Sequence, residues 1–394
     1  MSVIEIKKGI YSVGAIHWDR RLFDELVPTP DGTTYNAYLI KGSEKTALID
    51  TVDPEKTHIL IRNLKHLNVK RIDYVIANHA EQDHSGSIPT ILEMYPEAKV
   101  VTNAKCKGML MDLLTIPEER FMVIKDRESI SLGDRTLQFI FAPWVHWPET
   151  MFTYLEEDRI LFTCDLFGSH FATSRLYANE DEKVLEDAKR YYAEIMMPFR
   201  VQIKKYLDWV EELSPKIIAP SHGPLWKNPD FIIRAHREWV SDSFKNIVLI
   251  PYISMHHSTK QMVEYLADAL VERGIEVSLF NLTVTDIGKF AIALVDAPTM
   301  VLGAPTVLVG THPAAIYAAY LTNALRPKLK YVGIIGSYGW GGKAVDHIKA
   351  QLSSLRVELF EPVLSKGVPG DEDFKNLDKL AEEILKKHKE LGLK

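Results

Sequence analysis

Only two cysteines, Cys106 and Cys164, occur in the 394 residues of this chain. Two cysteines cannot build a disulfide framework or a cysteine zinc site, and no CxxC pair is present that could hold a rubredoxin-type iron. A metal ion bound by this protein must therefore be held by histidine, aspartate and glutamate side chains.

Long apolar runs and long basic runs are also missing. No run reaches the ~18 apolar residues that would span a bilayer. Residues 1–10 have neither the apolar segment nor the cleavage site of a signal peptide. With a net charge of −6, the chain has no general electrostatic attraction for nucleic acid. We expect a cytoplasmic protein that neither crosses a membrane nor binds nucleic acid.

The length is too great for one ordinary hydrophobic core and predicts two domains. Hydrophobic residues make up 46% and charged residues 25% of the chain, a balance typical of globular proteins. The pattern of apolar runs changes after about Asp242. We therefore place one domain at residues 1–243 and a second at residues 244–394.

The first domain begins with short β-rich runs over residues 33–163, spaced like strands paired in hairpins. Helical patterns follow at residues 180–195 and 201–213, and the apolar run at 216–220 is typical of one more strand. This part of the sequence predicts a mixed fold with sheets inside and helices outside.

The second domain alternates regularly between apolar runs and amphipathic stretches. Five runs read as buried strands: 246–251, 276–281, 299–305, 330–337 and 357–362. Helices are predicted between and after them, at 259–273, 286–294, 313–325, 343–354 and 371–391. This alternation predicts a doubly wound parallel sheet of flavodoxin size, in which ligands bind at the carboxyl ends of the strands.

The segment NHAEQDHSG, residues 78–86, follows an apolar run and offers four potential metal ligands: His79, Glu81, Asp83 and His84. In an extended segment, side chains two residues apart point the same way. We therefore expect His79, Glu81 and Asp83 to converge on one side, with His84 reaching the same place from a turn.

Three further candidates, His146, Asp165 and His222, also follow directly on strand-like runs. Seven ligands exceed the four of one tetrahedral zinc ion and suit two metal ions that share a bridging carboxylate. Asp165 is the natural bridge because it lies between the two ligand sets in chain order. Three carboxylates make the set harder than an all-histidine zinc site and favour iron or manganese. We predict iron.

Most other histidines show no such pattern, and a single histidine is more often a surface or core residue than a ligand. On this ground we exclude His58, His66, His236, His347 and His388, and leave His17 and His312 unassigned.

A phosphate site is predicted where the first strand of the second domain ends. Ser254, Ser258 and Thr259 bring hydroxyl groups to the N-terminus of a predicted helix, a place that suits a phosphate. An ordinary helix cap would show the same residues. Neither a GxGxxG fingerprint nor a Walker pattern is present, so a mononucleotide fits better than a dinucleotide or a triphosphate.

Two more loops, GAPTVLVG at 303–310 and GSYGWGGK at 336–343, follow the third and fourth strands. Their glycines allow a ring to approach the backbone closely, and Tyr338 or Trp340 could stack on it. The three loops together predict an FMN site. Its predicted residues are Ser254, Met255, His256, His257, Ser258, Thr259, Pro305, Thr306, Val307, Leu308, Ser337, Tyr338, Gly339, Trp340, Gly341 and Gly342.

The ligand pattern resembles that of the metallo-β-lactamase superfamily, whose hydrolases carry a second histidine where this chain has Glu81. That replacement, together with HWPETM at 146–151 and GTTYNAY at 32–38, is similar to the flavodiiron proteins. The resemblance covers nearly the whole chain. It implies an N-terminal metallo-β-lactamase-like αββα sandwich and a C-terminal flavodoxin-like doubly wound parallel sheet.

The same resemblance implies a role for each candidate ligand. One iron takes His79, Glu81 and His146, the other takes Asp83, His84 and His222, and Asp165 bridges them. It also implies that His170 and Tyr192 support the site by hydrogen bonds and that Trp147 excludes solvent, although Trp147 and Tyr192 could equally be packing residues.

Three stretches depart from the family pattern. Related proteins carry Gly-Asn where this chain has His257-Ser258, Asn-Asn where it has Leu308-Val309, and a histidine near Leu22-Phe23-Asp24. These departures leave the flavin contacts open. They also leave open whether dioxygen or nitric oxide, the substrates that the resemblance implies, is preferred.

A flavin hydroquinone and a diferrous pair each store two electrons, and together they match the four that convert dioxygen to water. The resemblance therefore implies reduction of dioxygen to water, of nitric oxide to nitrous oxide, or of both. It further implies a separate electron donor, either rubredoxin or a reduced deazaflavin, and a head-to-tail homodimer or a homotetramer. Two alternatives stay open: a di-zinc hydrolase with an accessory flavodoxin-like module, and a flavin protein whose metal site is vestigial.

Overall fold

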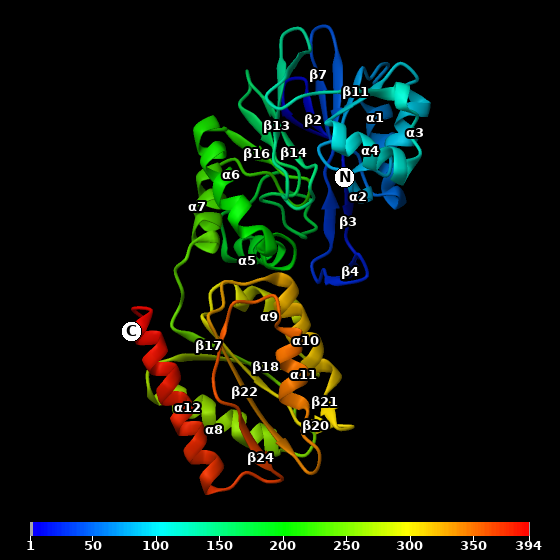
Figure 1. The fold of residues 1–394 in the computed structure, drawn as a ribbon. Helices are drawn as coiled ribbons and strands as arrows, with labels where there is room; N and C mark the ends of the chain where they lie inside the picture. The colour runs from blue at the N-terminus through cyan, green and yellow to red at the C-terminus, as the bar shows by residue number, and fades with distance from the viewer. Residues whose placement is uncertain (1–2, 394) are drawn as a thin grey trace. The chain divides into compact units, whose positions relative to one another are not determined.

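The computed structural model describes residues 3–393, which form two compact units. Unit 1 comprises the chain up to Tyr192 together with Phe199–Val240, and unit 2 comprises Ala193–Pro198 together with the chain from Ser241 onward (Figure 1). Among residues 3–393, none of the helices combines the length and the apolar composition that a bilayer crossing requires.

Unit 1 contains a sheet of seven strands and a sheet of five. The seven-stranded sheet has the order β1 (Ile4–Lys7), β2 (Ile10–Ser12), β7 (Tyr38–Lys41), β8 (Thr46–Ile49), β9 (Tyr74–Ile76), β10 (Lys99–Thr102) and β11 (Phe121–Val123). The five-stranded sheet has the order β12 (Ser129–Ser131), β13 (Thr136–Phe141), β14 (Met151–Leu155), β15 (Ile160–Phe162) and β16 (Ile217–Ala219). One apolar cluster joins alternate residues of both sheets, such as Ile49 and Phe139, so the sheets pack face to face.

Helices cover the outer faces of this sandwich. The opposite residues of the first sheet, including Leu48 and Val75, pack with the helices α1 (Thr57–His66), α3 (Ile88–Met94) and α4 (Ala104–Leu114). The second sheet packs against α6 (Arg200–Leu213), as shown by Phe152, whose ring lies 6.4 Å from that of Tyr206. Unit 1 also contains α5 (Glu182–Tyr191) and α7 (Pro229–Val240). The layers are therefore helix, sheet, sheet and helix.

Unit 2 contains a parallel sheet with the order β18, β17, β19, β22 and β23, and β24 also pairs with β22. Figure 1 shows α8 and α12 on one face of this sheet and α9, α10 and α11 on the other. The strands are β17 (Ile247–Tyr252), β18 (Glu276–Asn281), β19 (Thr299–Gly303), β22 (Tyr331–Tyr338), β23 (Glu358–Leu359) and β24 (Val363–Lys366). The helices are α8 (Ser258–Glu272), α9 (Ile287–Leu294), α10 (Pro313–Leu325), α11 (Ala344–Gln351) and α12 (Asp371–Glu390).

Two of the five predicted buried strands differ from the prediction. β18 lies at the edge of the sheet, and Leu279 is 44% exposed there. The run at 357–362 forms only the short exposed strand β23, and pairing with β22 resumes at Val363 after a shift of one residue. Pro362 has no N–H for the ladder, which accounts for the interruption.

His388 attaches α12 to the start of the sheet in unit 2. Its ring is buried, with Nδ1 lying 2.7 Å from Oδ1 of Asn246 and Nε2 lying 2.8 Å from Oγ1 of Thr299. Burial lowers the pKa of His388 to about 4, whereas the unfolded chain binds a proton at the ordinary value near ~6.5. The stability contributed by neutral His388 is therefore complete above the unfolded pKa and is lost as the pH falls toward the folded one.

We predict that the free energy of unfolding falls between pH ~6.5 and ~4, and that it falls less in His388→Gln, because this variant has no imidazole to protonate. Urea unfolding at several pH values would measure both slopes. The same substitution at the exposed His347 is the control and should keep the wild-type slope. Equal slopes for His388→Gln and the wild type would contradict the prediction.

Candidate dinuclear metal centre

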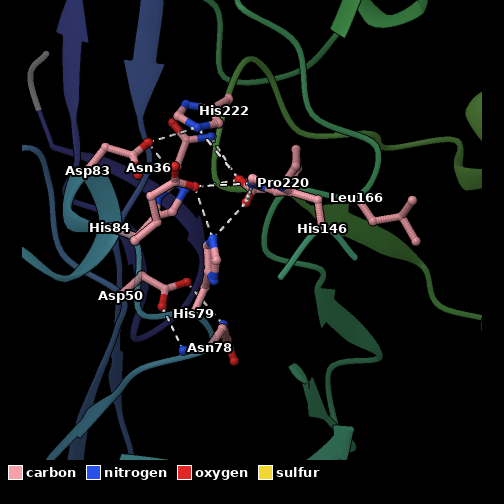
Figure 2. A network of polar contacts seen from close by, with 12 residues as sticks. Asn36, Asp50, Asn78, His79, Asp83, His84, His146, Leu166, Pro220 and His222 are labelled. Carbon is pink, nitrogen blue, oxygen red and sulfur yellow. Dashed lines mark hydrogen bonds and ion pairs between the residues drawn. The ribbon is translucent and has the colours of Figure 1, made fainter. Parts of the chain in front are cut away.

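The seven predicted ligands meet in unit 1, where segments following β9, β13, β15 and β16 come together. Figure 2 shows His79, Asp83, His84, His146 and His222 at this place. Their donor atoms form two groups, and within each group all donor atoms lie within 4.8 Å of one another. One group is His79, Glu81, His146 and Asp165, and the other is Asp83, His84 and His222. We call these the His79 position and the His84 position.

In the His79 position, Oε2 of Glu81 lies 3.0 Å from Nε2 of His79 and 3.1 Å from Nε2 of His146. In the His84 position, Oδ2 of Asp83 lies 3.3 Å from Nε2 of His84 and 3.1 Å from Nε2 of His222. Ligands that bind one ion at about 2.0–2.2 Å are separated from one another by roughly 3–3.5 Å. The spacing in both groups is therefore that of atoms around a shared ion.

Asp165 presents one carboxylate oxygen to each position. Its Oδ2 lies 3.6 Å from Nε2 of His79 and 3.5 Å from Nε2 of His146. Its Oδ1 lies 2.9 Å from Nε2 of His84 and 3.6 Å from Nε2 of His222. This is the geometry of a carboxylate that bridges two ions.

The expected convergence of His79, Glu81 and Asp83 on one side is wrong. The segment is extended only as far as Glu81, and Gln82–Ser85 forms the short helix α2. The helical turn rotates Asp83 away from Glu81 and places it with His84. The change of backbone conformation at Glu81 thus divides one short motif between two metal positions.

The residues present fit metal ions. Both oxygens of Asp83 and Asp165 are buried and take part in no hydrogen bond within the described chain. Burial alone would raise the pKa of Asp165, but the neighbouring imidazoles, His84 first, hold it well below its usual value. Burial alone would lower the pKa of His84, but Asp83 and Asp165 raise it to about 10. The buried carboxylates therefore need neighbouring positive charge, and protonated imidazoles provide it when no metal ion is bound.

The end of β8 positions the ligand loop that follows β9. Asp50 accepts hydrogen bonds from both the backbone N–H and the side-chain amide of Asn78, at 2.9 and 3.0 Å. Thr51 donates its backbone N–H and its hydroxyl to the carbonyl of His84, at 2.7 and 2.6 Å. Both ends of the loop that contains four ligands are thereby fixed before any metal binds.

The motif GTTYNAY positions His222 in a similar way. The carbonyl of Thr34 lies 2.6 Å from Nδ1 of His222, so this nitrogen donates and Nε2 is left for the metal. Asn36 donates to the carbonyls of Pro220 and Gly223, both at 2.8 Å. The motif therefore supports a ligand that lies far away in the sequence.

Glu149 is a residue of this site that the sequence did not reveal. Its Oε1 lies 2.8 Å from Nδ1 of His79 and accepts the backbone N–H of Ala80 at 3.0 Å. Glu149 is only 2% exposed. It stands two residues after Trp147 in HWPETM, and no residue pattern distinguishes a glutamate that bonds to a ligand from one at the surface.

Of the three predicted neighbours of the metals, Tyr192 is misplaced. Its ring lies 5.8 Å from that of His236 and 5.4 Å from that of Trp239. Tyr191 is the tyrosine beside the ligands, with its ring 5.7 Å from that of His222. Consecutive residues of a helix point about 100° apart. Tyr191 therefore faces the predicted ligands, whereas Tyr192 faces the packed side of the helix.

His170 and Trp147 do lie beside ligands. The ring of His170 lies 4.9 Å from that of His222, and Oγ1 of Thr33 lies 2.9 Å from its Nδ1. The ring of Trp147 contacts the ring of His79 edge to face at 4.8 Å. Both contacts are ring packing against a ligand, and their part in the reaction stays a prediction.

A second candidate site lies in unit 2, at the carboxyl ends of β17, β19 and β22. A cavity of about 310 Å³ opens there, a size typical of small-molecule sites. It is lined by Ser254, Met255, His256, Ser258, Thr259, Pro305, Thr306, Ser337, Tyr338, Gly339, Gly367 and Val368. The last two, from the loop after β24, were not predicted, and the predicted His257, Val307, Leu308, Trp340, Gly341 and Gly342 are not among the lining residues.

The N-terminus of α8 faces this cavity. The side chain of the N-cap residue His257 makes no capping hydrogen bond, so the backbone N–H groups of Ser258 and Thr259 are available to a ligand. The hydroxyl of Ser254 accepts the N–H of Lys260 at 3.2 Å, and those of Thr259 and Ser337 lie 2.9 Å apart. Hydroxyls and free N–H groups at a helix N-terminus suit a phosphate.

Comparison with known proteins bears on both sites. A family model described as ODP family beta lactamase matches residues 33–223. The chain is 38% identical to a nitric oxide reductase of Moorella thermoacetica, with 97% of this chain and 98% of the relative covered. It is 32% identical to the flavo-diiron protein FprA2 of Clostridium acetobutylicum, with 98% and 100% covered.

Among solved structures, the rubredoxin oxygen:oxidoreductase of Desulfovibrio gigas matches with a TM-score of 0.94, at 29% identity and with 99% of each chain covered. The predicted fold class, a metallo-β-lactamase-like αββα sandwich followed by a flavodoxin-like sheet, is confirmed.

Replacing the bridging carboxylate should affect both metal positions. We predict that Asp165→Ala lowers the metal content from two ions per chain to one or none, because each position loses an anionic ligand. Elemental analysis of the purified variant would measure the content, and circular dichroism would verify the fold. Asp134→Ala, at an exposed carboxylate, is the control and should keep two ions; the same content in Asp165→Ala would contradict the prediction.

Proposed function

The chain belongs to the flavodiiron protein family of oxidoreductases, and we propose that it reduces dioxygen to water, nitric oxide to nitrous oxide, or both. The arrangement of Asp165 between two sets of three ligands carries this proposal. When bound, two ferrous ions and a reduced FMN supply the four electrons that dioxygen requires.

The residues of unit 1 hold the ions and limit the access of water. His79, Glu81 and His146 would hold one iron and Asp83, His84 and His222 the other. Phe23, at the hairpin between β4 (Leu22–Phe23) and β5 (Val27–Pro28), packs its ring 5.8 Å from that of His222. Trp147 packs its ring against that of His79 at 4.8 Å, so that the two aromatic side chains exclude water from part of the cluster, which strengthens electrostatic interactions there.

The residues of unit 2 suit FMN. Ser254, Ser258 and Thr259 lie at the N-terminus of α8, where His257 provides no side-chain cap and the phosphate would accept several hydrogen bonds. Each hydrogen bond to a charged group is worth about 1.5–3 kcal/mol. Tyr338, which lines the same cavity, offers a ring against which the flavin would stack.

The electron donor is a separate redox partner, for which rubredoxin and a reduced deazaflavin are the two candidates. Mixing each reduced donor anaerobically with the oxidised protein would identify the partner by the faster bleaching of the flavin absorbance. A location in the cytoplasm stays a prediction.

We also propose that the protein works as a homodimer, in which the flavin of one chain supplies the metals of the other, or as a tetramer of two such dimers. We therefore predict that analytical ultracentrifugation detects a dimer or a tetramer and no active monomer. The control is sedimentation at several protein concentrations, since a weak dimer dissociates on dilution. A monomer with full activity would contradict this arrangement.

The central prediction concerns reoxidation. We expect the anaerobically reduced protein to be reoxidised within seconds by dioxygen, by nitric oxide, or by both, and the faster gas identifies the preferred substrate. Stopped-flow absorbance of the flavin measures the rates, with Asp165→Ala as the control that should lose turnover. Two zinc ions, no reoxidation beyond that of free FMN, and hydrolysis of an ester or a lactam would favour the hydrolase instead. Unchanged turnover in Asp165→Ala would favour a flavin protein with a vestigial metal site.

A further inference from the structure

Three of the four predicted histidine ligands, His79, His84 and His222, differ in what their Nδ1 atom contacts. Nδ1 of His79 faces the carboxylate of Glu149 at 2.8 Å, with both side chains fully buried. Nδ1 of His222 faces a neutral backbone carbonyl, that of Thr34. Nδ1 of His84 is buried and has no hydrogen-bond partner within residues 3–393. Of these three imidazoles, only that of His79 therefore has a charged hydrogen-bond acceptor at Nδ1.

Glu149 is held in place independently of any metal. Its Oε1 also accepts the N–H of Ala80 at 3.0 Å, and its backbone carbonyl accepts the side-chain amide of Asn103 at 2.6 Å. Asn103 is in turn fixed as the N-cap of α4. The carboxylate of Glu149 is thus held in position to accept the Nδ1–H of His79.

A carboxylate that accepts the N–H of a metal-bound imidazole fixes its tautomer and makes the other nitrogen a stronger donor. Asp165 contributes one oxygen to each position, and Glu81 and Asp83 are matched single carboxylates. Glu149 therefore adds a carboxylate directly behind an imidazole of the His79 position, whereas neither His84 nor His222 has a carboxylate at Nδ1 within residues 3–393.

We propose that Glu149 is a positioning residue that makes the His79 position the tighter of the two metal positions, so that this position fills first. The inference rests on the proposed di-metal centre and concerns its order of loading, which holds for any divalent ion that both positions accept. The two ions are consequently inequivalent from the moment they bind.

The test is a titration of metal-free protein with Co²⁺, followed by the visible d–d absorption and by calorimetry. Wild type should bind in two steps with distinct spectra. In Glu149→Gln, which keeps the shape but removes the charge, the first step should weaken by about 10- to 100-fold, and the second should stay nearly unchanged. An unchanged first step in Glu149→Gln would overturn the proposal.

A second pair of variants leaves Glu149 intact and keeps the proposal testable if Glu149→Gln does not fold. The tight step should disappear in His146→Ala and remain in His222→Ala; the reverse result would overturn the proposal. Asp187→Asn removes a buried carboxylate that pairs with Lys183 rather than with a ligand, and it should bind Co²⁺ like the wild type. Because the readout needs neither FMN nor iron, it can succeed or fail independently of the proposed gas reduction.

Discussion

The site in unit 1 depends on one electrostatic constraint, the gathering of three carboxylates at a single point, two of them buried and that of Glu81 only 14% exposed. Glu81, Asp83 and Asp165 are separated only by imidazoles, in surroundings where an unpaired charge is very costly. Neighbouring imidazoles lower the pKa of Asp165 and carboxylates raise that of His84, so the cluster itself demands cations. Two divalent ions would supply this positive charge and would bind all seven side chains at once.

The backbone that surrounds the cluster is also unusual. Several residues beside the ligands have left-handed backbone conformations although they are not glycine: Asp50 (φ 53°), Trp144 (φ 70°), Cys164 (φ 51°) and Phe167 (φ 69°). Each such residue costs about 1–3 kcal/mol and persists only where its surroundings over-determine it. Here the sandwich core provides that support, since strands of both sheets end at the site and share one apolar cluster. The rigid sheets thus hold the strained turns that aim the ligands.

Particular residues show how much of the site could be predicted from the sequence. All seven predicted ligands lie together in the structure, and they were predicted because imidazoles and carboxylates recurred directly after apolar runs. The expected convergence of His79, Glu81 and Asp83 on one side was wrong, because a short helix after Glu81 replaced the extended backbone. The two groups of donors are those that the family resemblance implied. The misplacement of Tyr192 had a similar origin, since helical phase decides which of two adjacent tyrosines faces the site. In unit 2, the exposure of β18 followed from its place at the sheet edge, which a hydrophobic pattern does not encode.

The sequence by itself determined the two-part architecture and the donor set, because strand periodicity and ligand chemistry are local properties of the chain. The local pattern did not show which donors lie together, and tertiary structure alone decided which oxygen of Asp165 faces which position and that Glu149 stands behind His79. These are relations between segments up to 188 residues apart, as between Thr34 and His222. They exist only after the two sheets pack, because packing converts separate strand ends into one site.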